Sequence, residues 1–287
     1  MKNFALIANA VKDNSEECAK HIIEILEANG CNCTACLFSP ENNAPDAEYL
    51  FTNPEMIPAE TEAVLSLGGD GTFIHASKDL IGLHLPVFGI NFGTLGYLTE
   101  VDVNGFKEAI KSIVNGDFRI EERMLLRCDI IVDGEIKKRG LALNDIVVTR
   151  SLDTSIAELD LVVDGHYLNH YSADGIILAT PTGSTGYNLS AGGPVVLPTA
   201  GIVLATPICA HTLNSRTVVF PADVTIEVSV RSGNREKIQQ SYVIVDGEKA
   251  ILLEEGAVVR ASKASSVAKI IKINRSSFIE KLGRKMR

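Results

Sequence analysis

A glycine-rich turn at residues 68–72, with the sequence GGDGT, stands between an apolar run and a helix-like run. Its glycines let the backbone turn sharply and bring N–H groups against phosphate oxygens, and the amino end of the following helix favours an anion. A carboxylate here repels phosphate, unless it takes a proton from a hydroxyl or holds a metal ion that bridges phosphates. Asp70 is therefore a candidate reacting carboxylate, and the alternative is an ordinary turn with a solvated aspartate. The phosphate-binding loop would consist of Gly68, Gly69, Gly71 and Thr72.

A second segment, residues 174–194, is dense in glycine, serine and threonine. Many hydrogen-bonding groups lie close together there, and Tyr187 offers a flat surface for a base or a ribose. The segment suits a polar, planar ligand. The alternative is a structural loop, because the same residue types accumulate in ordinary turns.

Two adjacent polar residues, Asn144 and Asp145, interrupt the apolar run 141–148, which otherwise reads as one strand. An amide that donates and accepts matches an adenine edge, and a carboxylate can accept hydrogen bonds from two ribose hydroxyls. The alternative is a turn at a strand edge with both side chains in water.

Strand-like and helix-like runs alternate over the first 120 residues, which is typical of a parallel sheet covered by helices. Such sheets bind ligands at the carboxyl ends of their strands, where the glycine-rich turn stands. Asn14 is a plausible N-cap with Glu17 three residues later. We expect strands at 4–8, 63–67 and 86–90, one helix that ends near Gly30, and helices at 73–80 and 103–114.

After about residue 118 the strand-like runs are separated by Asp-Gly pairs at 133–134, 164–165 and 246–247, which favour tight hairpins. Antiparallel sheets are therefore expected, with strands at 125–133, 156–163, 176–179, 224–230 and 242–245. The predicted domains are an α/β nucleotide-binding domain at 1–120, a β-rich domain at 121–265 and a C-terminal segment at 266–287.

The C-terminal segment has a helical pattern. We expect an amphipathic helix that packs on a domain and keeps its basic residues in water, with a contact to anionic partners as the alternative. The apolar face would hold Phe278, Ile279, Leu282 and Met286, with Lys281, Arg284, Lys285 and Arg287 around it.

Composition narrows the function classes. The 287 residues are 46% hydrophobic, and 27 basic against 36 acidic residues give a formal charge of -9, so a nucleic-acid binder is not expected. The longest mostly apolar stretch, 201–210, is too short for a membrane span, and the apolar segment before Ala-Asn-Ala at 8–10 is too short for a signal peptide. We expect no membrane partner and a cytoplasmic protein.

Six cysteines lack the density of a disulfide scaffold, which agrees with a reducing compartment. Cys31, Cys33 and Cys36 have no second ligand pair at a zinc-finger spacing, so we interpret them as strand residues. His166 and His170 stand at strand spacing without a third ligand at a persuasive offset. We expect no structural zinc.

The chain resembles the bacterial NAD kinase (ATP-NAD kinase) family. The resemblance is carried, in the family's order, by residues 68–72, by 89–91 through 93–99, by Asn144-Asp145 and by 180–194, and it covers nearly the whole chain. The first motif is shared with diacylglycerol and sphingoid lipid kinases and approximately with phosphofructokinases, whereas TPTGSTGYNLSAGGP at 180–194 is specific to NAD kinases.

The resemblance implies transfer of the γ-phosphoryl group of ATP to the 2′-hydroxyl of the adenosine ribose of NAD, giving NADP, with a divalent cation, Mg²⁺, and with Asp70 as the proton acceptor. It also implies an α/β nucleotide domain, a β-sandwich-like NAD-binding domain, a C-terminal segment that returns to the first domain, and a homodimer or homotetramer. By position, the residues that contact NAD would be Asp70, Gly71, His75, Asn144, Asp145, Asp174, Thr182, Thr185, Gly186, Tyr187, Asn188, Leu189, Ser190, Cys209 and Glu248.

Three positions depart from the commonest family pattern: Gly186 stands where Ala is frequent, Ser172 where Arg is frequent, and Glu248 where Gln is frequent. The lost Arg leaves the choice between NAD and NADH open. Two rivals are a lipid kinase, which the second-domain loop argues against, and a non-catalytic dinucleotide sensor. Asp70 argues against the sensor, because a pure binder gains nothing from a carboxylate close to phosphates.

Overall fold

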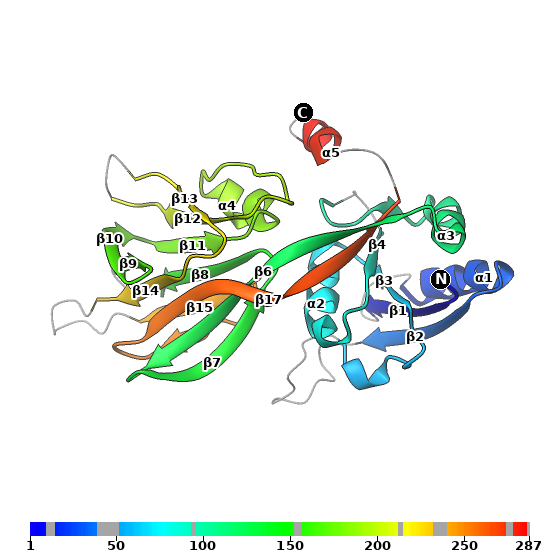
Figure 1. The fold of residues 1–287 in the computed structure, drawn as a ribbon, viewed down its shortest axis with the longest axis horizontal. Helices are drawn as coiled ribbons and strands as arrows, with labels where there is room; N and C mark the ends of the chain where they lie inside the picture. The colour runs from blue at the N-terminus through cyan, green and yellow to red at the C-terminus, as the bar shows by residue number, and fades with distance from the viewer. Residues whose placement is uncertain are drawn as a thin grey trace. The chain divides into compact units, whose positions relative to one another are not determined.

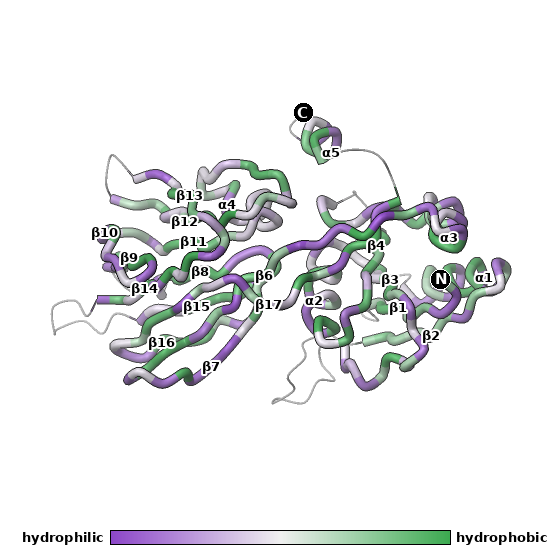
Figure 2. Tube along the Cα trace, viewed as in Figure 1, coloured by the Kyte–Doolittle hydropathy of each residue, from purple (hydrophilic) through white to green (hydrophobic). Residues whose placement is uncertain are grey.

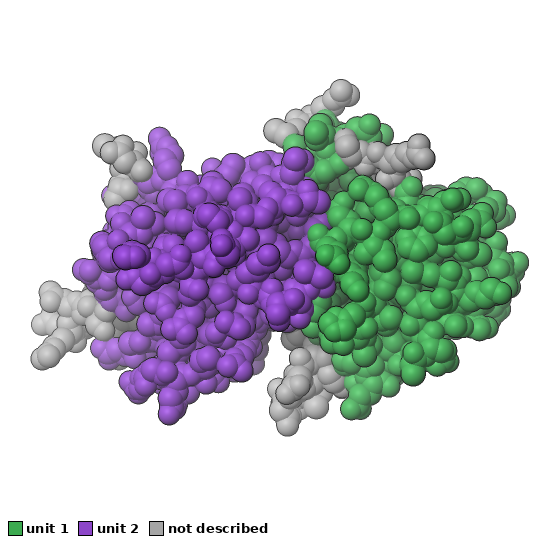
Figure 3. All heavy atoms as spheres, viewed as in Figure 1, with its two compact units in different colours: residues 1–122, 268–287 green, residues 123–267 purple. Residues whose placement is uncertain are grey.

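The computed structural model describes residues 1–9, 15–38, 52–92, 96–151, 156–211, 215–231, 240–273 and 278–285. The chain forms two compact units, residues 1–122 with 268–287 and residues 123–267 (Figure 3). Asn14, the 93–95 part of the second family motif, Met286 and Arg287 lie outside the described residues. None of the described helices has the length and hydropathy of a membrane span.

The first unit is built on a parallel sheet in the order β2-β1-β3-β4, with β5 beside β4 (Figure 1). Every residue of β3 and β4 is buried, and the hydropathy of these strands agrees with that (Figure 2). The predicted parallel sheet is confirmed. Its elements are β1 (Asn3–Asn9), α1 (Ser15–Ala28), β2 (Asn32–Phe38), β3 (Ala63–Leu67), α2 (Asp70–Asp79), β4 (Val87–Asn91), β5 (Val101–Asp102), α3 (Phe106–Asn115) and α5 (Phe278–Lys285), with 3-10 turns at Pro54–Met56 and Ile81–Leu83.

Helices α1 and α3 pack together and bury their apolar faces against the sheet in one cluster, which includes Ile22 and Ile110. Helix α3 begins at Phe106, three residues later than expected, because the Asp102 carboxylate accepts the Gly105 N–H at 2.8 Å and holds a turn there. The helix ends at Gly116, whose φ of 82° is a left-handed conformation that glycine adopts without strain. The glycine-rich turn follows the carboxyl end of β3 and leads into α2.

The second unit is a sandwich of antiparallel sheets. One sheet has the order β13-β12-β11-β8-β15-β16, and facing it are β10-β9-β14-β17 and the β6–β7 hairpin. A large apolar cluster with residues from both sheets fills the interior. The strands are β6 (Arg119–Val132), β7 (Glu135–Ala142), β8 (Asp145–Arg150), β9 (Ala157–Val163), β10 (His166–Ala173), β11 (Gly175–Ala179), β12 (Ile202–Ile208), β13 (Val218–Pro221), β14 (Ile226–Val230), β15 (Ser241–Val245), β16 (Ile251–Leu253) and β17 (Val258–Lys272).

All three Asp-Gly pairs form hairpin turns. Asp133, Asp164 and Asp246 have φ of 52°, 48° and 50°, and the glycines that follow have φ of 78°, 76° and 72°. Positive φ at both central residues is the type I′ geometry, which matches the twist of the flanking strands. The hairpins predicted from the sequence are confirmed.

The six-stranded sheet is apolar on both faces. On β11, Ile176 and Leu178 point into the sandwich, whereas Ile177 joins a second cluster on the outer face with Val147 and Leu204. Ala191 and Val196, from the segment that the sequence singles out as ligand-binding, pack on this outer cluster. The segment is thereby placed on the outer face of the sheet.

Candidate functional site

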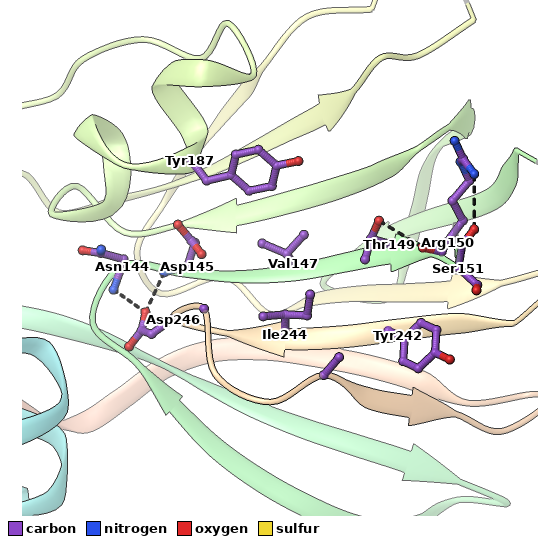
Figure 4. Close-up of a pocket in the computed structure, with 12 residues that line it drawn as sticks. Asn144, Asp145, Val147, Thr149, Arg150, Ser151, Tyr187, Tyr242, Ile244 and Asp246 are labelled. Carbon is purple, nitrogen blue, oxygen red and sulfur yellow. Dashed lines mark hydrogen bonds between the residues drawn. The ribbon is translucent and has the colours of Figure 1, made fainter. Parts of the chain in front are cut away.

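A pocket of about 860 Å³ opens on the outer face of the six-stranded sheet (Figure 4). Its floor is formed mainly by β8 and β15, and the Tyr187 ring lies over it. The lining residues are Asn144, Asp145, Val147, Thr149, Arg150, Ser151, Tyr187, Tyr242, Ile244, Asp246, Gly247 and Ala250. Of the predicted NAD-binding residues, the pocket thus brings together Asn144, Asp145 and Tyr187.

One end of the pocket is organised by the Asp246 carboxylate. Its Oδ2 accepts the N–H of Leu143 at 2.8 Å, and its Oδ1 accepts those of Asn144 and Asp145 at 2.8 and 3.0 Å. In Figure 4, Asn144, Asp145 and Asp246 lie together at one end of β8. Asp246 was expected only as a hairpin residue; the Asp-Gly signal gave its turn and not its partners.

The run 141–148 is interrupted, as the two polar residues indicated, but the interruption is also a change of sheet. β7 ends at Ala142 in one sheet and β8 begins at Asp145 in the other, so the chain crosses between sheets at Leu143 and Asn144. Asp246 supplies acceptors for the N–H groups at this crossing. Asp145 is only 6% exposed, so the solvated-turn alternative is wrong for that side chain.

The segment 180–183 closes over the same crossing. Thr180 donates its hydroxyl to the Leu143 carbonyl at 2.6 Å, and its N–H bonds the Asn144 carbonyl at 2.8 Å. A Cβ at Gly183 would lie 2.2 Å from the Asn144 carbonyl oxygen, so only glycine permits this approach. Thr182 is buried and accepts a hydrogen bond from Arg123 Nη1 at 3.2 Å.

The rest of the segment forms a 3-10 turn (Gly183–Thr185) and the short helix α4 (Tyr187–Ser190). Asn188 is fully buried: its amide donates to the Ser184 and Pro194 carbonyls and accepts from the Thr206 hydroxyl. It holds the fold of the segment rather than facing the pocket. Thr185 and Gly186 are half-buried, whereas Leu189 and Ser190 are exposed.

Arg150 and Asp174 form an ion pair at the other end of β8. Arg150 Nε donates to Asp174 Oδ1 at 2.7 Å, and the Thr149 hydroxyl donates to the Asp174 carbonyl at 3.0 Å. Sequence reasoning missed Arg150, since a basic residue at the end of a strand carries no signal of its own. Ser172 does not face this pair: its hydroxyl donates to Glu158 at 2.9 Å.

Tyr187 is 47% exposed, yet its phenol is in an environment that disfavours ionisation. Burial raises the pKa of Tyr187, and the negative charges of Cys209, Asp174 and Asp145 raise it further. The phenol therefore stays a hydrogen-bond donor over the physiological range. Cys209 lies just past the end of β12, and Glu248 follows the Asp246-Gly247 turn; neither lines the pocket.

The predicted phosphate loop lies in the first unit, where β3 ends and α2 begins. Asp70 is half-buried, and its carboxylate accepts three N–H groups, from Tyr97 at 2.8 Å on Oδ2 and from Leu98 and Thr99 at 3.2 and 3.3 Å on Oδ1. A Cβ at Gly96 would lie 1.9 Å from Asp70 Oδ1, so the 96–99 segment wraps closely around the carboxylate. The alternative of a turn with a solvated aspartate is wrong.

The remaining residues of this loop differ in exposure. Gly68 and Thr72 are buried, and a Cβ at Gly68 would lie 2.5 Å from the Thr72 hydroxyl. Gly69 is half-buried and Gly71 is exposed, with open space where each Cβ would stand. The loop therefore keeps free space in front of two glycines at the amino end of α2. His75 is half-buried on the next turn of this helix.

The histidines and cysteines to which the sequence analysis gave no metal-binding role lie on or beside strands β2 and β10. The carboxylates of Glu158 and Asp160 on β9 both form hydrogen bonds with the ring of His170 on β10. The spacing along the sequence did not suggest these partners, because they lie on the neighbouring strand. Burial opposes ionisation of Asp160, but hydrogen bonds from Arg231 and His170 outweigh it and lower its pKa. Cys33 and Cys36 are strand residues of β2, as expected, whereas Cys31 lies just before this strand, so the interpretation is wrong for Cys31.

Comparison with known proteins identifies the family of the chain. The ATP-NAD kinase N-terminal domain model matches residues 4–118, and the C-terminal domain model matches residues 143–273. An NAD kinase of Lachnoclostridium phytofermentans is 35% identical over 284 residues, which cover 98% of each chain. The chain belongs to the NAD kinase family.

Two solved structures of kinases resemble the fold. Yeast NADH kinase in complex with NADH superposes with a TM-score of 0.86 at 25% identity, covering 99% of this chain and 87% of that one. An NAD kinase from Archaeoglobus fulgidus in complex with ATP gives 0.74 at 25% identity, covering 99% and 98%. The α/β domain and the β-sandwich expected from the sequence are those of an NAD kinase.

Proposed function

We propose that this NAD kinase family member transfers the γ-phosphoryl group of ATP to the 2′-hydroxyl of the adenosine ribose of NAD and releases NADP and ADP. The observation that carries the proposal is Asp70: a carboxylate fixed by three N–H groups in a glycine turn that otherwise suits phosphate. A carboxylate in this place is useful where a hydroxyl must be deprotonated beside a phosphoryl group.

In the proposed step, Asp70 accepts the proton of the 2′-hydroxyl while the hydroxyl oxygen bonds to the γ-phosphorus and the bond to the β,γ-bridging oxygen breaks. Oδ2 is the better placed acceptor, because it holds one N–H of the 96–99 segment where Oδ1 holds two. Because the carboxylate is already oriented, less entropy is lost on reaching the transition state.

The donor phosphates would bind the N–H groups of Gly69 and Gly71 and the amino end of α2, with Gly68 and Thr72 shaping the loop. The Gly69 and Gly71 positions have open space where a side chain would stand, which agrees with close approach of a phosphate. A divalent cation such as Mg²⁺ would neutralise the phosphate charge; its usual ligands are phosphate oxygens, water and one or two carboxylates.

The dinucleotide would occupy the pocket of the second unit. Asn144 and Asp145 suit an adenine edge and ribose hydroxyls, and Tyr187 supplies a flat surface with a neutral phenol. Asp174 would contact the ligand from the Arg150 end. We assign lesser contacts to His75, Thr182, Thr185, Gly186, Leu189, Ser190, Cys209 and Glu248, and a supporting role to Asn188.

We further propose a homodimer or homotetramer in the cytoplasm. All six cysteines are free, which agrees with a reducing compartment. Sedimentation of the purified protein at several concentrations measures the mass; a monomer at every concentration would contradict the proposed oligomer.

The test is NADP formation by the purified protein from NAD, ATP and Mg²⁺, followed by chromatography, with Asp70→Asn beside it. NADH and polyphosphate replace NAD and ATP in parallel reactions, and EDTA removes the cation. NADP from the wild type, little from the variant and none with EDTA is the expected result. Tight NAD binding without product from any donor would contradict the proposal.

The dinucleotide sensor is the second candidate, and one observation favours it. Three N–H groups bind Asp70, so this carboxylate has a structural use that needs no chemistry. A sensor would bind NAD with wild-type and Asp70→Asn proteins alike and form no NADP with either, so the same assay separates the two functions.

A further inference from the structure

Helix α5 is attached to the first unit by a buried lysine. Lys281 is 9% exposed, whereas Ile279 is 65% exposed and Arg284 and Lys285 are exposed. The expectation that Ile279 is buried and that the basic residues stay in water is therefore wrong for Ile279 and for Lys281. A lysine is rarely buried without a partner, because removing its charge from water is costly.

The partner of Lys281 is Glu100, which is 3% exposed. Glu100 Oε2 accepts from Lys281 Nζ at 3.1 Å and from Lys272 Nζ at 2.9 Å. Lys281 Nζ also donates to the Thr99 carbonyl at 3.0 Å. The two lysines thus share one carboxylate, and of the three contacts just described only the one from Lys281 to the Thr99 carbonyl reaches the backbone.

A second contact of α5 lies two residues earlier on the same loop. The Tyr97 and Phe278 rings are 6.1 Å apart between centroids, and Lys285 Nζ lies 4.5 Å from the Tyr97 ring centroid. Contacts of both kinds are attractive. Helix α5 therefore contacts Tyr97 and Thr99, the first and last residues of the three that donate N–H groups to Asp70.

From these contacts we propose that Lys281 is a positioning residue for Asp70. The ammonium group holds the Thr99 carbonyl, which restrains the peptide unit that follows Thr99. Because this unit is bonded to the Thr99 Cα, the restraint limits displacement of Thr99 and so helps to keep its N–H within reach of Asp70 Oδ1. Helix α5 thereby sets the orientation of the carboxylate without touching a substrate. The inference rests on the proposed function, in which Asp70 takes the proton.

The loop has other supports that keep it folded when Lys281 is changed. The Gly96 N–H donates to the Thr99 hydroxyl at 2.9 Å, and the Glu100 N–H donates to the Gly89 carbonyl at 2.9 Å. Glu100 keeps Lys272 as its ionic partner. Loss of Lys281 should therefore loosen the loop rather than unfold the unit.

The test compares Lys281→Met with Lys272→Met, because both remove one ammonium from the same carboxylate but only the first frees the Thr99 carbonyl. We expect Lys281→Met to lower kcat about tenfold or more, since small displacements of reacting groups have effects of that order. The Kd for NAD, measured by calorimetry, should stay within about twofold because the pocket is in the other unit. Both variants should lower Tm by similar amounts, since each removes one ionic partner of Glu100. The loss of kcat should be smaller in Lys272→Met than in Lys281→Met.

Three further variants complete the test. Lys281→Arg should recover most of kcat, because it keeps the charge and the donors, and Ile279→Ala, at an exposed position of the same helix, should match the wild type. Phe278→Ala removes the contact with Tyr97 and should lower kcat without changing the Kd for NAD. This variant tests the role of helix α5 if Lys281→Met does not fold. Wild-type kcat in Lys281→Met, or equal losses in both lysine variants, would overturn the positioning role. A wild type that makes no NADP would instead overturn the proposed function.

Discussion

Asp70 in the first unit and Asp246 in the second are held in the same way. Each carboxylate accepts three consecutive backbone N–H groups, one on Oδ2 and two on Oδ1. Both aspartates are half-buried. Hydrogen bonding by itself therefore does not separate a reacting carboxylate from one that only organises a site.

Their surroundings do separate them. Asp70 begins α2, beside glycines with open space in front of them, whereas Asp246 forms a type I′ turn and holds the crossing that presents Asn144 and Asp145 to the pocket. The first arrangement suits phosphate and the second suits a polar, planar ligand. The same chemical device thus supports two different tasks, and substitutions at the two positions should fail in different ways.

The largest effect is expected for Asp70→Asn. Loss of a general base should lower kcat by about 10²–10⁴-fold, whereas the Kd for NAD should stay within a few-fold. Steady-state kinetics and calorimetry measure the two quantities. Full turnover by this variant would reassign the base, and Asp246, which lines the pocket, would be the next carboxylate to test.

Asp246→Asn should change NAD binding more than turnover. An amide cannot accept at both positions, so the crossing at Asn144 and Asp145 should loosen and the Kd for NAD should rise by about tenfold, the scale of a lost hydrogen bond to a charged group. The loss of kcat at saturating NAD should be smaller than that of Asp70→Asn. If instead kcat falls while the Kd is unchanged, the two aspartates have exchanged roles.

The two aspartates also show how much of the site could be predicted from the sequence. Asp70 was found because its glycine neighbours carry a local signal, and Asp246 was found only as a turn, because its three partners lie about a hundred residues away along the chain. Arg150 and Lys281 were missed for the same reason: the sequence shows a charge but not the Asp174 or Glu100 that pairs with it.

The fold shows the same limit. Alternating runs predicted the parallel sheet, and Asp-Gly pairs predicted the hairpins, since both are set by neighbouring residues. β12, β13 and the long strand β17 were not predicted, because their place depends on partners distant in the chain. The interruption at Asn144 was visible, but that it marks a change of sheet was not.

Tyr187→Ala sharpens the assignment of one ligand to each unit. Removing a flat ring that a base or ribose packs on should raise the Kd for NAD by about three- to tenfold, the range of an aromatic contact. The KM for ATP should change little, because the proposed phosphate loop is in the other unit. Equal effects on NAD and ATP would show that this pocket is not the dinucleotide site.

The smallest effect should come from thiol labelling, which compares a cysteine in each unit. Burial, and then the charges of Cys36 and Glu27, raise the pKa of Cys33 to about 12, so at pH 8 only about one Cys33 in 10⁴ is a thiolate. Cys209 is exposed and lies close enough to Tyr187 for its charge to affect that phenol. Mass spectrometry after labelling at pH 8 should therefore find Cys209 modified first.

NAD should slow the labelling of Cys209 by about threefold, which is the occupancy effect of ligand at twice its Kd. Labelling of Cys33 should not respond to NAD, which makes it the internal control, and ATP without NAD should leave Cys209 as reactive as in the free protein. Protection of Cys209 by ATP alone would place the donor beside Tyr187. In that case Asp246 would lie on the phosphate side and the two aspartates could no longer be assigned to separate ligands.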